Sequence, residues 1–149
     1  MSRADAMREI AAAVKDLVES PLYPYRQENG YLPVIGEGDL HAALMIIGEA
    51  PGEQEALSGR PFVGAAGAVL DDLLATIGLR REEVYITNVV KDRPPGNRNP
   101  RVAEIALYRP FLLRQIEIIQ PAVIATLGSF SLAAILEAFR HPEAGRRIS

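Results

Sequence analysis

One run of four apolar residues, Leu44-Met45-Ile46-Ile47, constrains the fold of this 149-residue sequence more than any other stretch. It is apolar at consecutive positions, as a strand buried on both faces of a parallel sheet requires. Similar runs at 83–90 and 122–127 predict two more strands, and helical patterns lie between them. Right-handed crossovers would place those helices on both faces of the sheet. The sequence therefore predicts an α/β fold, a three-layer α/β/α sandwich with a central parallel sheet formed by 42–47, 83–90 and 122–127.

Four helices are expected where apolar residues recur at helical spacing. Their predicted ranges are 4–19, 67–77, 100–120 and 129–139. The third of these is expected to begin with Asn99 as its N-cap and Pro100 in its first turn.

Glycine and proline interrupt the segment 20–40, which we expect to be irregular. No repeat or linker divides the chain, so residues 1–149 are predicted to form one domain. The tail from His141 adds no strand, so we expect this domain to be incomplete at its C-terminal end, with one strand missing.

Composition excludes several kinds of site. The sequence contains no cysteine and two histidines, so we expect no disulfide, no thiolate metal site and no histidine-built metal cage. No apolar run approaches the roughly 18 residues that span a membrane, and residues 1–19 carry too many charges for a signal peptide. We therefore expect a cytoplasmic protein with no membrane partner.

The net charge of -3 argues against a protein held to DNA by its overall field. A local excess of basic residues lies between Lys91 and Arg101. This segment could contact a few phosphates, or it could be an ordinary solvated loop.

The loops that follow the first two predicted strands carry a carboxylate, an aromatic ring and a carboxamide: Glu49, Phe62 and Asn88. Loops after parallel strands meet at the carboxyl edge of a sheet, where open α/β folds bind ligands. These three groups are the parts of a pocket for a flat polar ring. Other interpretations stay open, because Phe62 could fill the core under its loop and Asn88 could bond to nearby backbone. A phosphate loop at 48–52 is disfavoured because it matches no nucleotide motif and Pro51 lacks an N–H donor.

Four motifs resemble those of the family 4 uracil-DNA glycosylases. They are Gly-Glu-Ala-Pro-Gly at 48–52, Gly-Arg-Pro-Phe-Val-Gly at 59–64, Ile-Thr-Asn-Val-Val-Lys at 86–91 and Arg-Pro-Pro-Gly-Asn-Arg-Asn-Pro at 93–100. The resemblance implies the glycosylase fold and a DNA repair enzyme that removes uracil from DNA without a catalytic metal. The alternative is a non-catalytic glycosylase-like module that binds DNA or a base.

The resemblance also implies which residues form the site. The substrate would be bound by Glu49, the backbone around Ala50, Phe62 as stacking floor and Asn88 as base reader, with Glu49 and Asn88 as the catalytic pair. A carboxamide offers both a donor and an acceptor, so it can pair with O4 and N3–H of uracil. Either Glu49 or Glu55 could position water or stabilise positive charge on the sugar.

DNA contacts are predicted along the rim of this pocket, through Lys91, Arg93, Asn97 and Arg98. The partner implied is uracil-containing DNA, bound by a monomer.

Two departures from the family pattern matter. Family 4 enzymes carry an iron–sulfur cluster on four cysteines, and the corresponding positions here are Leu17, Ser20, Asp92 and Tyr108. These side chains are not cluster ligands, so we expect no cofactor, with Leu17 and Tyr108 buried together in the vacated space. The family's final His-Pro motif is also missing, because His141 and Pro142 follow a predicted helix rather than a strand. Without that histidine donor, uracil release by residues 1–149 alone is expected to be slow.

Overall fold

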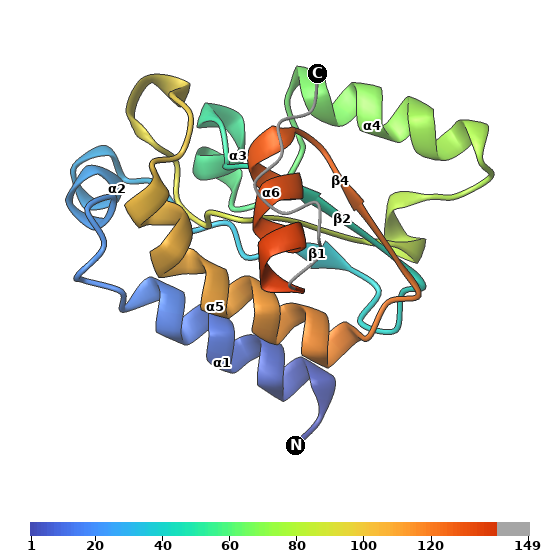
Figure 1. Cartoon of the computed structure of the whole chain (residues 1–149). Coiled ribbons are helices and arrows are strands. Elements are labelled where there is room, and N and C mark those ends of the chain that lie inside the picture. The colour runs from blue at the N-terminus through green and yellow to red at the C-terminus, as the bar shows by residue number, and fades with distance from the viewer. Residues whose placement is uncertain (140–149) are drawn as a thin grey trace.

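The computed structural model describes residues 1–139, which contain a four-stranded sheet in the order β1-β3-β2-β4 (Figure 1). Strand β2 (Leu44–Gly48) is central and pairs in parallel with β3 (Tyr85–Asn88) and with β4 (Val123–Thr126). The predicted parallel sheet is confirmed. One addition is β1 (Glu37–Gly38), a short strand antiparallel to β3, in a segment that was predicted to be irregular.

Helices cover both faces of this sheet, which confirms the three-layer sandwich (Figure 1). One layer contains α1 (Arg3–Lys15), α5 (Val102–Ile119) and α6 (Ser129–Ala138). The other layer contains α4 (Ala65–Thr76).

Side chains that alternate along β2 explain the layering. Met45 and Ile47 pack with Leu112 of α5 on one face of the sheet. Ile46, which lies between them in the sequence, packs with Leu70 of α4 on the other face. Because both faces of the strand are buried, its sequence is continuously apolar rather than alternating.

Two short helices lie in segments where none was predicted. Helix α2 (Tyr23–Asn29) has Pro24 in its first turn, a position that tolerates proline because its missing N–H would be unpaired there anyway. Helix α3 (Glu53–Ser58) begins with a capping interaction in which Glu55 accepts a hydrogen bond from the Gly52 N–H.

Some helix boundaries also differ from the predictions. Helix α1 ends at Lys15 instead of residue 19, and α5 begins at Val102 with Arg101 as its N-cap instead of Asn99. Glu104 causes the second difference, because its carboxylate accepts the Arg101 N–H at 2.9 Å. Single-turn 3₁₀ helices occur at η1 (Arg81–Glu83) and η2 (Pro95–Asn97).

None of the helices within residues 1–139 combines the length and the apolar character needed to cross a lipid bilayer.

Candidate functional site

A pocket of about 230 Å³ lies at the carboxyl edge of the sheet, where β2 and β3 end. Gly48 and Asn88, the last residues of these strands, are register partners. The pocket is lined by the loop after β2, the loop that carries Phe62, the helices α3 and α4, and the end of β3. The lining residues are Ala50, Gly52, Glu55, Phe62, Ala66 and Asn88. The structure therefore brings Ala50, Phe62 and Asn88 together, as expected from the sequence.

The carboxamide of Asn88 is held in the pocket without a partner of its own. The residue is only 3% exposed. Its backbone carbonyl accepts a hydrogen bond from Lys91 Nζ, but no hydrogen bond among residues 1–139 uses its side-chain amide. The amide lines the pocket and makes no hydrogen bond to the described part of the protein, so it is available to bind a ligand there. The alternative, in which Asn88 bonds to nearby backbone through its side chain, is not supported.

Gly48 allows the amide and the aromatic ring to meet. A Cβ atom at this position would lie 2.4 Å from Asn88 Oδ1 and 2.5 Å from Phe62 Cζ. Any side chain here would displace one of the two groups. The sequence placed Gly48 only in a disfavoured phosphate loop and in the 48–52 motif, and a glycine directly after a buried strand was the one signal of a close approach.

Phe62 both fills the core under its loop and lines the pocket, the two roles that the sequence left open. Its side chain is partly buried against the core cluster that contains Ile46 and Leu70, and it also lines the pocket. Its backbone is left-handed, with φ of 51°, which is unusual for a residue with a bulky side chain. Gly67 packs so closely on this turn that a Cβ atom there would lie 1.9 Å from the Phe62 carbonyl oxygen.

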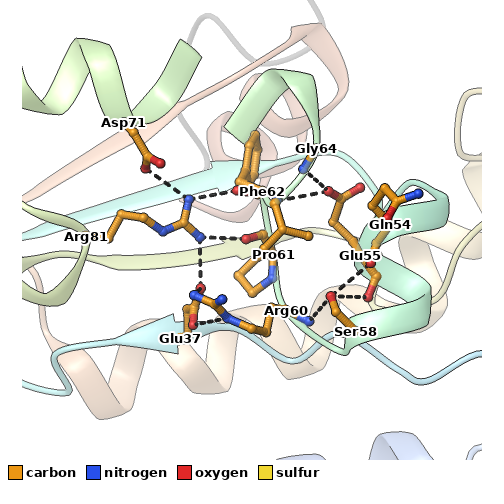
Figure 2. A network of polar contacts seen from close by, with 11 residues as sticks. Glu37, Gln54, Glu55, Ser58, Arg60, Pro61, Phe62, Gly64, Asp71 and Arg81 are labelled. Atoms are coloured by element: carbon orange, nitrogen blue, oxygen red, sulfur yellow. Dashed lines mark hydrogen bonds and ion pairs between the residues drawn. The ribbon is translucent and has the colours of Figure 1, made fainter. Parts of the chain in front are cut away.

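Glu55 joins the two loops that form the pocket. Its Oε1 atom accepts the Gly52 N–H at 2.9 Å, and its Oε2 atom accepts the N–H groups of Val63 at 3.0 Å and Gly64 at 2.8 Å. Figure 2 shows the last of these bonds, with Glu55 beside the Phe62 loop. Both oxygens therefore hold backbone in place, although the residue lines the pocket.

Glu49 lies next to this pocket and is not part of its lining. It lines an adjoining hollow of about 160 Å³, which shares Ala50 and Gly52 with the first. Its Oε2 atom accepts the Phe130 N–H at 2.8 Å, in the first turn of α6. The structure thus places Glu49 in a hollow beside the Phe62–Asn88 pocket, instead of placing all three side chains in a single crevice.

The prediction that Lys91 contacts DNA is wrong, because the side chain is 0% exposed. Its Nζ atom donates to Thr87 Oγ1 at 2.6 Å, to the Asn88 carbonyl oxygen at 2.6 Å and to Gln115 Oε1 at 2.5 Å. Three acceptors match the three hydrogens of an ammonium group. Burial holds the pKa of Lys91 well below its usual value. The acceptors come from β3 and α5, so the sequence around Lys91 did not reveal them.

The other three predicted DNA-binding residues lie nearer the surface. Arg93 donates to Tyr31 Oη at 2.7 Å and to Asn97 Oδ1 at 2.9 Å, and it has no acidic partner among the described residues. Arg98 forms a two-pronged ion pair with Glu104 at 2.8 and 2.7 Å, and the hydrogen bond from Arg98 lowers the pKa of that carboxyl. The free positive charge of this segment is therefore smaller than its sequence indicates.

The four positions that correspond to cluster cysteines form one buried group. Tyr108 Oη lies 2.7 Å from Ser20 Oγ and donates to Asp92 Oδ2 at 2.5 Å. Leu17 and Tyr108 belong to one core cluster, with exposures of 7% and 0%, which confirms their expected burial. An aliphatic chain, two hydroxyl groups and one carboxylate do not form a ligand set for an iron–sulfur cluster, so these residues do not fit that cofactor.

Metal ligands are not grouped elsewhere either: residues 1–139 contain no cluster of three or more His, Asp or Glu side chains that could hold an ion. His141 and Pro142, which were not expected to form the family's final His-Pro motif, lie outside the described residues.

Comparison with known proteins agrees with the fold. The model of the family described as "Uracil DNA glycosylase superfamily" matches residues 35–148. The chain therefore belongs to the uracil-DNA glycosylase superfamily.

Within the superfamily, the chain is similar to curated type-4 uracil-DNA glycosylases. It is 44% identical over 131 residues to that of Pyrobaculum aerophilum, covering 88% of this chain and 65% of the relative. It is 46% identical over 136 residues to that of Thermotoga maritima, covering 91% and 69%. It is also 46% identical over 136 residues to the type-4 enzyme of Archaeoglobus fulgidus, covering 91% of this chain and 64% of the relative. The chain thus spans about two thirds of the length of these relatives.

Proposed function

We propose that this chain is a DNA repair protein that hydrolyses the N-glycosidic bond of uracil flipped out of DNA. One observation carries the proposal: the carboxamide of Asn88, which has no hydrogen-bond partner within residues 1–139, lines a pocket of about 230 Å³ together with the Phe62 ring. The names of the type-4 relatives support the same activity. The cytoplasmic location and the monomeric state stay predictions from the sequence.

Asn88 would recognise the base through its pairing edge. Uracil presents an N3–H donor and an O4 acceptor, which match the oxygen and the NH₂ group of a carboxamide. Cytosine presents the opposite pattern at the same atoms. A fixed amide would leave buried groups unpaired against cytosine, at a cost of about 1–3 kcal/mol per group.

Phe62 would supply the surface on which the flipped base stacks, with the loop backbone at Ala50 beside it. A base that leaves the duplex loses its stacking neighbours, and an aromatic side chain restores about 1–3 kcal/mol of that interaction. The ring is supported from below by the core residues Ile46 and Leu70. It is therefore already in place before the base enters.

Glu49 is our candidate for the carboxylate that assists bond cleavage. As the glycosidic bond breaks, positive charge develops on the sugar and negative charge on uracil. Of the two carboxylate oxygens of Glu49, only Oε2 accepts a hydrogen bond from the described residues. Oε1 is therefore available to orient water or to face the sugar. Glu55 is a weaker candidate, because both of its oxygens accept backbone N–H groups.

DNA would cross the rim beside the adjoining hollow, which is lined in part by Asn97 and Arg98. Arg93 is bonded to Asn97 and lacks an acidic partner among residues 1–139, so it is the strongest candidate for a phosphate contact. We expect weak, salt-sensitive binding with few phosphate contacts.

We also propose that the protein works without an iron–sulfur cluster. The support is the absence of cysteine from the 149 residues and the hydrogen-bonded group of Ser20, Asp92 and Tyr108 that fills the corresponding space. Purified protein should contain no stoichiometric iron and should lack the visible absorbance of a cluster. Stoichiometric iron would refute this proposal.

The activity can be tested with single-stranded oligonucleotides that differ only in having uracil or cytosine at one position. We expect release of uracil and not of cytosine. Glu49→Gln should slow release by about 10²- to 10⁴-fold while leaving DNA binding intact. The matched control is Glu53→Gln, the same change at an exposed residue of α3. Binding without release in the unchanged protein would instead support the non-catalytic module.

A further inference from the structure

We propose that Arg81 and Glu37 are positioning residues that hold the loop 59–64 in the conformation that presents the Phe62 ring to the pocket. The inference rests on the proposed function of that pocket, and it assigns a role to two residues that do not line it. Figure 2 shows Arg81 on one side of the loop and Glu55 on the other.

The loop needs an external support because Phe62 has a left-handed backbone, with φ of 51°. This conformation crowds the Cβ atom of any L-residue, and bulky residues adopt it only where their surroundings impose it. Gly67 contributes by leaving room for the turn, since a Cβ atom there would lie 1.9 Å from the Phe62 oxygen. Space alone does not select the conformation, so attractive contacts must do so.

Arg81 supplies these contacts through two successive carbonyl groups. Its Nη1 atom donates to the Phe62 oxygen and its Nη2 atom donates to the Pro61 oxygen, each at 2.7 Å. The guanidinium is planar and presents its donors in a fixed fork. One fork can bind both oxygens only while the two carbonyls point to the same side, so the pair of bonds selects the turned backbone.

Glu37 orients the guanidinium. Its Oε1 atom accepts from Arg81 Nη2 at 2.8 Å, and the same carboxylate accepts from Arg60 at 3.1 Å through both oxygens. Burial alone would raise the pKa of Glu37, but the hydrogen bonds from Arg60 and Arg81 outweigh it and lower the pKa. The carboxylate therefore stays charged at neutral pH and links both ends of the Arg60–Phe62 segment to strand β1.

Glu55 completes the support from the opposite side. It accepts the N–H groups of Val63 and Gly64, the two residues that follow Phe62. The carbonyls before the turn are thus bound by a cation, and the amides after it are bound by an anion. The Phe62 ring is the side chain that this arrangement directs to the pocket.

The first test measures the loop itself and needs no activity. Amide hydrogen exchange at Val63 and Gly64 should be faster in Arg81→Gln than in the unchanged protein, and Glu37→Gln should show a smaller increase in the same direction. The matched control is Arg80→Gln, because Arg80 is the neighbouring residue, its side chain is 79% exposed, and within residues 1–139 it pairs only with Glu83. Unchanged exchange at both amides in Arg81→Gln and Glu37→Gln would overturn the proposal.

The second test is a double-mutant cycle on single-turnover uracil release. Arg81→Gln should slow release by about ten- to hundredfold when Phe62 is present. In the Phe62→Ala background the same change should cost about twofold or less, because a residue that acts through Phe62 has nothing left to position. If Arg81→Gln slows uracil release by the same factor with Phe62 and with Phe62→Ala, the proposal is overturned. If the unchanged protein releases no uracil, the proposed function fails, and the exchange measurement alone decides the role of Arg81.

Discussion

Lys91 and Asp92 are neighbours in the chain, yet their charged groups enter two different buried networks. Asp92 lies against a cation, with Arg26 Nε 2.9 Å from its Oδ1 atom. In the described part of the chain, Lys91 donates only to uncharged acceptors, from Thr87, Asn88 and Gln115. Both side chains are essentially inaccessible, at 1% and 0% exposure.

The two networks support different parts of the molecule. The Asp92 network connects Arg26 and Ser20 from the N-terminal segments with Tyr108 of α5, and Arg26 also donates to the last carbonyls of α1. The Lys91 network connects α5 to the end of β3 and holds the carbonyl of Asn88. We infer that the first network serves stability and that the second one mainly keeps the base reader in place.

The largest effect should come from breaking the charge pair. Asp92→Asn leaves the Arg26 cation buried without an anion, and removing one partner of a buried pair costs about 3–5 kcal/mol. Urea unfolding should show this loss in the free energy of unfolding. Arg114→Gln, which breaks the exposed pair with Glu117, is the control and should change stability little. A loss as small as that of the control would mean that the Asp92 network is not a stabilising one.

Removing one hydroxyl should have a smaller effect and should separate stability from activity. Tyr108→Phe deletes the hydrogen bond to Asp92, which is charge-assisted and should contribute about 1.5–3 kcal/mol. The variant should unfold at lower urea, while single-turnover uracil release stays within about twofold of the unchanged protein. A large loss of activity in the folded variant would contradict the division of roles between the networks.

Of these three variants, Lys91→Met should lose the least stability. It should lose more activity than Tyr108→Phe. The change removes the Lys91 donor, but the Asn88 and Gln115 oxygens keep long hydrogen bonds from Thr87 Oγ1 at 3.4 and 3.5 Å. It also removes the cost of burying an amine, so we expect a net loss of only about 1–3 kcal/mol. The Asn88 carbonyl loses its short hydrogen bond from Lys91. Displacing Asn88 should slow uracil release by about ten- to hundredfold. Circular dichroism and single-turnover assays at a temperature well below unfolding would separate the two effects. Unchanged release would show that Lys91 does not position the base reader.

The pH dependence of stability should show whether burial lowers the pKa of Lys91. Burial lowers the pKa of Lys91 in the folded state, so above that pKa the unfolded chain binds more protons than the folded one. The lysine contribution to stability therefore rises with pH, up to the unfolded value of 10.5. The free energy of unfolding of the unchanged protein should increase relative to that of Lys91→Met between pH 7 and pH 9. A constant difference would contradict a lowered pKa.

The sequence predicted the sheet well because its signal is local. Continuous apolar runs mark strands that are buried on both faces. The predicted ranges contain β3 and β4, and the range 42–47 covers all of β2 except its last residue, Gly48. The loops that follow parallel strands meet at one edge, so Phe62 and Asn88 could be placed in one pocket without coordinates. The motif resemblance then supplied the function.

The sequence failed where a side chain acts through distant partners. Nothing near Lys91 indicates that Thr87 and Gln115 provide acceptors for it, so its charge was assigned to the surface. Arg81 binds backbone carbonyls, which carry no residue identity and leave no motif. Glu49 was placed among the pocket residues by its position after β2, but the N-terminus of α6 draws its carboxylate into the adjoining hollow.

The central claim is that the carboxamide of Asn88 reads uracil, and Asn88→Asp tests it most directly. A carboxylate keeps the shape of the side chain but loses the donor for O4 and repels the negative charge that develops on uracil. The measurement is single-turnover release of uracil from a single-stranded oligonucleotide, with Asn29→Asp at the end of α2 as the same chemical change on an exposed residue. We expect release by Asn88→Asp to be slower by at least about tenfold and release by Asn29→Asp to be unchanged. Equal release by the two variants would contradict the account.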